Sequence, residues 1–183
     1  MSLETPDWSA LPYPVDDGGA RHLSGLRLPS LLLPATDGTA VDLAVLPGRT
    51  VVYAYPRTGR PDAANPDGWD GIPGARGCTP QSCAFRDHAD ELRRLGVDHL
   101  FGLSTQDTAY QAEAGERLHL PFPLLSDADL LLTDALRLPT FEVAGITLLK
   151  RLTLVLDVGM VTHVFYPVFP PDQSAADVIA WLR

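Results

Sequence analysis

The chain has 183 residues, of which 45% are hydrophobic and 20% charged, so it is long enough for one well-buried domain and short for two. Its net charge of -9 argues against nucleic acid or an anionic membrane as a main partner, because either would need a basic face. No apolar run reaches about 18 residues and the N-terminus shows no signal-peptide pattern, so we expect a cytoplasmic protein.

The N-terminal part of the chain is predicted to hold an arm and a hairpin. Residues 1–24 are rich in Pro, Gly and Asp and lack a hydrophobic period, which indicates an arm laid over the surface through its aromatic side chains. An Asp-Gly pair at 37–38 predicts the turn of a hairpin between apolar runs at 31–33 and 41–43. The β-branched and aromatic run 50–55 then predicts a buried central strand.

A long loop follows this strand. Residues 57–77 carry many Gly and Pro residues and no period, and compact domains seldom hold such loops unless they are functional or disordered. We expect Trp69 and Ile72 to pin the loop to the body of the protein. Its end delivers the backbone to Cys78, the first of two cysteines.

The rest of the chain alternates helices and strands. We expect a helix from about 79 to 94, a strand at 99–104, a helix at 107–118, a strand at 120–125, a helix at 128–136, an antiparallel pair at 151–157 and 160–166, and a closing helix at 171–183. This order predicts an α/β, thioredoxin-like fold, in which a central mixed sheet is flanked by helices and preceded by the hairpin. It forms one domain over residues 25–183, after the arm of residues 1–24.

Both cysteines, Cys78 and Cys83, lie near a predicted helix start. Thr79 followed by Pro80 is typical of such a start, because the hydroxyl can cap free N–H groups and proline suits the first turn. Cys78 would then sit just outside the first turn, where free N–H groups and the helix dipole favour a thiolate, the nucleophilic form. Cys83 would lie inside the helix, whose apolar stripe is formed by Phe85, Ala89 and Leu92.

The five-residue spacing of the cysteines predicts motion. On a helix it separates them by about 140° and about 8 Å along the axis, whereas a disulfide needs Cα atoms within roughly 7 Å. The sulfurs could join only if the first turn unwinds, which suits Cys78 as the attacking thiol and Cys83 as the resolving one. Two buried, inert cysteines are the alternative. Zinc is not expected, since there is no second cysteine pair and the five histidines are scattered.

The sequence around the cysteines resembles the peroxiredoxins of the Q type, also called the bacterioferritin-comigratory-protein type. The resemblance runs from about residue 26 to 183 and rests on segments in the family's order: Tyr55-Pro56, Gly77-Cys78-Thr79, Cys83, Phe85-Arg86-Asp87, 120–127 and 151–159. It implies an antioxidant thiol peroxidase that reduces hydrogen peroxide and organic hydroperoxides without haem, metal or flavin. The implied cycle passes through a Cys78 sulfenic acid and a Cys78–Cys83 disulfide, which a thioredoxin-like protein reduces, and we expect a monomer.

The resemblance also implies roles for residues outside the cysteine helix. Arg151 would stabilise the thiolate and donate to the departing oxygen, because its guanidinium stays charged and offers several directed donors. Pro56 would shield the sulfur from bulk water. The family carries a threonine three residues before the first cysteine, where this chain has Ala75. Thr58 is our candidate for the missing hydroxyl, and Thr79, which we expect to cap the helix, is the alternative.

Two other functions remain open from the residues alone. A thiol-disulfide oxidoreductase shares the fold order, but it usually has two residues between its cysteines and this chain has four. A redox sensor without catalytic activity could use the same pair to switch a partner surface. Rapid peroxide consumption with a thiol reductant would distinguish a peroxidase from both.

Overall fold

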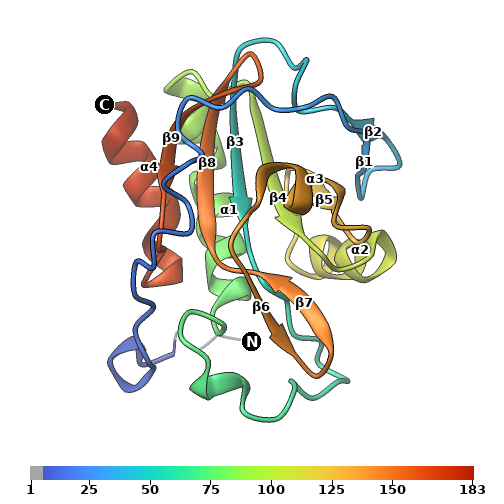
Figure 1. The fold of residues 1–183 in the computed structure, drawn as a ribbon, viewed down its shortest axis with the longest axis vertical. Coiled ribbons are helices and arrows are strands. Elements are labelled where there is room, and N and C mark those ends of the chain that lie inside the picture. Colours follow the sequence, from blue (N-terminus) through green and yellow to red (C-terminus); the bar gives the residue numbers. More distant parts are fainter. Residues whose placement is uncertain (1–5) are drawn as a thin grey trace.

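The computed structural model describes residues 6–183. Its centre is a five-stranded sheet in the order β5-β4-β3-β8-β9 (Figure 1). The parallel strands are β3 (Arg49–Ala54), β4 (His99–Ser104) and β5 (Leu124–Ser126), and the antiparallel ones are β8 (Leu152–Asp157) and β9 (Met160–Phe165). The predicted mixed sheet, with a parallel centre and an antiparallel edge, is confirmed.

The alternation of side chains along β3 divides the core into two layers. Val51, Tyr53 and Tyr55 face one side, where they pack with α1 (Cys78–Arg94) and α4 (Ser174–Leu182). Val52 and Ala54 face the other, where they pack with α3 (Leu131–Leu136) and with the segment that follows the N-terminal arm. Both layers form because a strand buried on two faces can be apolar throughout.

The smaller elements close the sheet at its edges. The hairpin of β1 (Leu33–Pro34) and β2 (Ala40–Val41) was predicted, with longer strands than it has. The 3-10 turn η3 (Pro171–Gln173) precedes α4, and α2 (Thr108–Arg117) begins after Asp107, whose side chain accepts from the N–H of Tyr110. The predicted strand at 120–125 was wrong in its first half, because Pro121 and Pro123 lack the N–H that a sheet requires.

A second hairpin was not predicted. It consists of β6 (Thr140–Val143) and β7 (Ile146–Leu149) and packs against the long loop after β3. Trp69, in the short 3-10 turn η2 (Trp69–Gly71), is buried there with Leu148, and Ile72 packs against the same cluster. The expectation that Trp69 and Ile72 pin the loop is therefore confirmed.

The start of α1 differs from the prediction. Cys78 is its first residue and Gly77 is its N-cap, with φ at 112°, so Thr79 lies inside the first turn and does not cap the helix. Glycine is required at 77, because a Cβ there would come within 2.6 Å of Pro171 and 2.9 Å of Trp8. Pro80 still falls in the first turn, where its missing N–H is harmless.

No helix within residues 6–183 is long and apolar enough to cross a membrane.

Candidate active site

The candidate site lies where the central parallel strands end. Tyr55 extends β3 by donating its N–H to the carbonyl of Leu103 in β4 at 3.0 Å. Pro56 follows and is buried, and its carbonyl accepts from the hydroxyl of Ser104 at 3.1 Å. The N-terminus of α1 reaches the same end of the sheet, so Cys78 lies at the carboxyl ends of the central parallel strands.

Two N–H donors point at the sulfur of Cys78. The backbone N–H of Arg57 and the Nη2 of Arg151 each lie 3.4 Å from Sγ. Sγ itself lies 3.7 Å from the carbonyl of Ala75 and is its donor while the thiol is protonated. Only 4% of Cys78 is exposed, so both donors contact the sulfur in a largely dry environment, where hydrogen bonds are stronger than in water.

Arg151 ties the end of the long loop to α1. It is 3% exposed, and its Nη2 also lies 3.2 to 3.3 Å from the carbonyls of residues 74–76. Its Nη1 donates to the side-chain carbonyl of Gln81, whose amide in turn donates to Ser174 at 3.3 Å. The guanidinium is thereby fixed in position beside the sulfur before any substrate arrives.

Gln81 is a site residue that sequence reasoning missed. It is fully buried in α1 and lies four residues before Phe85, so it extends the apolar stripe of the helix with a polar side chain. A buried amide needs partners, and here they are Arg151 and Ser174. The sequence signal that could have identified Gln81 is its position as a polar residue on a helix stripe that is otherwise apolar.

Thr58 is held by all of its polar groups. Its N–H and its hydroxyl both donate to the side-chain carbonyl of Gln106, at 3.0 and 3.4 Å, and its carbonyl accepts from the hydroxyl of Tyr110 at 2.9 Å. It is 1% exposed, and no hydrogen bond joins it to Cys78 within residues 6–183. The clamp fixes the neighbouring Arg57, whose N–H faces the sulfur.

Cys83 lies further along α1 and is half-buried, and both cysteines are free thiols. Burial raises the pKa of its thiol, with Arg86 acting weakly in the opposite direction. The helix around it is firmly packed, because Phe85 stacks on Tyr53 with ring centroids 4.4 Å apart. The hydroxyl of Tyr53 donates to Ser82 at 3.1 Å, so both residues next to the first turn are anchored to the sheet.

The model of the Redoxin family matches residues 23–179. Peroxiredoxin Bcp of Escherichia coli K12 is 31% identical over 160 residues, which cover 85% of this chain and 92% of that protein. The chloroplastic peroxiredoxin Q of Oryza sativa subsp. japonica is 32% identical over 161 residues, 87% of this chain but only 66% of that protein's length. The crystal structure of peroxidoxin BcpB from Mycobacterium tuberculosis matches with a TM-score of 0.70 and 28% identity over 87% of this chain and 96% of that one.

The chain belongs to the Redoxin family. Within it, the predicted similarity to the Q or Bcp type of peroxiredoxin is confirmed, and so is the thioredoxin-like fold.

In this peroxiredoxin a cleft of about 320 Å³ opens in front of Cys78. Thr79 lines it and Thr58 does not, so the two hydroxyls considered above differ in their access to a substrate. Neither donates to the sulfur. Within residues 6–183, no group of three or more His, Cys, Asp or Glu side chains is arranged to hold a metal ion.

Proposed function

We propose that the chain is a thiol peroxidase that reduces hydrogen peroxide and organic hydroperoxides, with Cys78 as the nucleophile. The observation that carries this proposal is the pair of N–H donors, one from Arg57 and one from Arg151, each 3.4 Å from the buried sulfur. Preorganised donors of this kind stabilise the thiolate, and they cost no reorganisation when the peroxide reacts.

The first step oxidises Cys78. The thiolate attacks the outer oxygen of the hydroperoxide, so that an S–O bond forms and the O–O bond breaks. The inner oxygen leaves with the electron pair and takes up a proton, which yields water from hydrogen peroxide or an alcohol from an organic hydroperoxide. Arg151 donates toward the oxygens of the reacting bond, and Pro56 restricts the access of water.

The second step forms the disulfide. The thiolate of Cys83 attacks the sulfenic sulfur of Cys78, and the hydroxyl group leaves as water once it is protonated. Both residues lie on α1, five positions apart, which corresponds to about 140° and about 8 Å on a regular helix. The first turn must therefore unwind before the sulfurs can bond.

A dithiol protein of the thioredoxin type then reduces the disulfide. It gives up two electrons and two protons, becomes a disulfide itself and restores the thiols of Cys78 and Cys83. We propose that the enzyme works as a monomer in a reducing compartment such as the cytoplasm, where such donors are maintained.

The proposal is tested with the wild type and the variants C78S and C83S. The wild type should consume hydrogen peroxide continuously with a dithiol donor, and C78S should consume none, because serine provides no accessible anion at neutral pH. C83S should react once and retain a sulfenic acid at Cys78, which a dimedone adduct in mass spectrometry detects. A C83S variant without that adduct, or an active C78S variant, would reverse the assignment of the two cysteines.

A further inference from the structure

The cleft in front of Cys78 is unusually basic for this chain. Four arginines line it, and no Asp or Glu is among the lining residues that the structure describes, although the protein has a net charge of -9. Three of them belong to the long loop and one to α2: Arg57, Arg60, Arg76 and Arg117. A positive cleft with low-dielectric walls raises the local concentration of anions.

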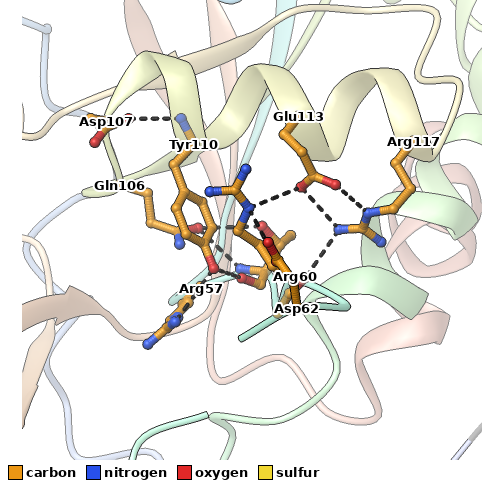
Figure 2. A network of polar contacts seen from close by, with 10 residues as sticks. Arg57, Arg60, Asp62, Gln106, Asp107, Tyr110, Glu113 and Arg117 are labelled. Carbon is orange, nitrogen blue, oxygen red and sulfur yellow. Dashed lines mark hydrogen bonds and ion pairs between the residues drawn. The ribbon is translucent and has the colours of Figure 1, made fainter. Parts of the chain in front are cut away.

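Two of the arginines share one carboxylate. Arg117 pairs with Glu113 at 2.7 Å, and Arg60 lies 3.8 Å from the same side chain. Figure 2 shows the three side chains close together. The guanidinium of Arg60 also lies over the ring of Tyr110, 5.0 Å from its centroid. Arg60 also lies 3.9 Å from Asp62, so two carboxylates offset the charges of Arg60 and Arg117, and the uncompensated positive charge of the cleft lies elsewhere.

Arg57 has no ion-pair partner within residues 6–183, unlike Arg76, which pairs with Asp70 at 2.8 Å. Its Nη2 donates to the hydroxyl of Tyr110 at 3.4 Å, and its Nε is buried without an acceptor. Figure 2 shows its guanidinium pointing away from the group formed by Arg60, Glu113 and Arg117. Its backbone N–H contacts the sulfur of Cys78, and both residues line the cleft, so the cleft holds an unpaired cation as well as the nucleophile.

We infer that the cleft prefers organic hydroperoxides that carry a carboxylate, and that Arg57 binds this carboxylate. The inference rests on the proposed peroxidase function and adds a substrate class to it. A planar guanidinium binds a carboxylate through two parallel hydrogen bonds, and a partly buried cation without a partner gains more from such a pair than an exposed one. The thiolate takes the outer oxygen as before, and the product is the hydroxy acid.

A neutral substrate gains nothing from a contact with Arg57. A comparison of an anionic with a neutral substrate therefore distinguishes binding of the substrate carboxylate from a general effect of Arg57 on the thiolate. Stabilisation of the thiolate would change the reaction with all peroxides by the same factor. Binding of a carboxylate would change only the ratio between an anionic substrate and its neutral counterpart.

The test uses 4-hydroperoxy-4-methylpentanoate and its methyl ester, which share the hydroperoxide group and the carbon chain and differ in the charge and in one methyl group. The second-order rate constant for oxidation of Cys78 is measured for each by rapid mixing. In the wild type the acid should react about tenfold faster than the ester at low salt, and the ratio should fall as the ionic strength rises. The ratio should fall to about one in R57Q and be partly kept in R57K, which retains the charge without the planar fork.

The matched control is R93Q, which removes an exposed arginine of α1 that pairs with Asp90 at 2.8 Å. It should keep the wild-type ratio. If hydrogen peroxide oxidised Cys78 of the wild type and the acid and the ester did so at similar rates, the inference would be overturned while the proposed function would stand. An R57Q variant with an unchanged ratio of the two rate constants would have the same meaning. A wild type in which no peroxide oxidises Cys78 would overturn the proposed function as well.

Discussion

Arg151 has two tasks that a substitution removes together. It donates to the sulfur of Cys78 at 3.4 Å, and it binds the carbonyls of residues 74–76 that lead into α1. R151M should therefore slow the oxidation of Cys78 by hydrogen peroxide by at least about tenfold, the effect of losing roughly 1.4 kcal/mol of transition-state stabilisation. Rapid-mixing kinetics measure this rate constant.

The neighbouring Lys150 provides the control for that variant, because its ammonium group pairs with Asp17 at 2.6 Å, away from the sulfur. K150M should oxidise at the wild-type rate. A thermal melt of R151M shows whether the loop has also lost its anchor, since unpaired buried carbonyls lower the free energy of unfolding. An unchanged rate constant in a folded R151M protein would remove Arg151 from the catalytic residues.

Thr58 is predicted to be a positioning residue. Its hydroxyl and its N–H share the side-chain carbonyl of Gln106, and this clamp holds the N–H of Arg57 against the sulfur. T58V should slow the oxidation of Cys78 severalfold, and Q106L should do the same because it removes the other half of the clamp. If T58V were slow while Q106L reacted at the wild-type rate, the hydroxyl itself would be the group that meets the peroxide.

The thiol of Cys83 gives the resolving step a pH dependence. Burial raises its pKa, so only a small fraction of Cys83 is thiolate at neutral pH. As long as the pH stays below the pKa, each unit by which the pH rises increases this fraction about tenfold. The rate of disulfide formation should therefore rise steadily between about pH 6 and pH 8. Conversion of sulfenic acid to disulfide, followed by acid quenching and mass spectrometry, measures it. A rate that does not change with pH would show that deprotonation of Cys83 does not limit the step.

At the scale of the element, α1 is built to unwind only in part. Its first two turns carry both cysteines, whereas Phe85 is fully buried and stacked on Tyr53. The burial of such a ring contributes roughly 2 kcal/mol, and it should stop the unwinding that the disulfide requires. The bonds from Gln81 and Ser82 to the rest of the protein lie on the unwinding side and must break.

Amide hydrogen exchange in the two redox states tests this division. Protection of residues 79–84 should fall when the disulfide forms, and protection of residues 88–94 should remain. C83S treated with peroxide serves as the control, because it is oxidised at Cys78 without a disulfide and should keep both segments protected. Loss of protection along the whole helix, or along none of it, would point to another route, such as a disulfide between two chains.

The elements that could be predicted are those whose burial repeats with a regular period. The central strand, the apolar stripe of α1 and the hairpin around Val158-Gly159 were recognised for this reason. The β6–β7 hairpin was missed because its residues are mostly half-exposed and do not alternate. Likewise, Cys78 and Arg151 are 73 positions apart, and only the resemblance to a family placed them in one site. Arg57 and Arg60 of the cleft were missed because loop residues have no period.

At the scale of the whole molecule, the N-terminal arm reaches the catalytic end of α1. The indole N–H of Trp8 donates to Asp172 at 3.0 Å, and its ring meets the edge of Phe169 with centroids 6.0 Å apart. The same ring lies against Gly77, the residue that caps the helix of Cys78. The arm thus connects the start of the chain, the closing helix and the nucleophile.

Removal of this contact should weaken both the fold and the protection of the sulfur. Trp8 is half-buried, so W8A should lower the free energy of unfolding by about 1 to 2 kcal/mol, which corresponds to a fall of the melting temperature by about 2 to 8 °C. The reduced variant should also be alkylated faster at Cys78 by iodoacetamide. Y13A is the control, because Tyr13 contacts the same Phe169 but is 62% exposed. If W8A melted and reacted like Y13A, the arm would not contribute to the site.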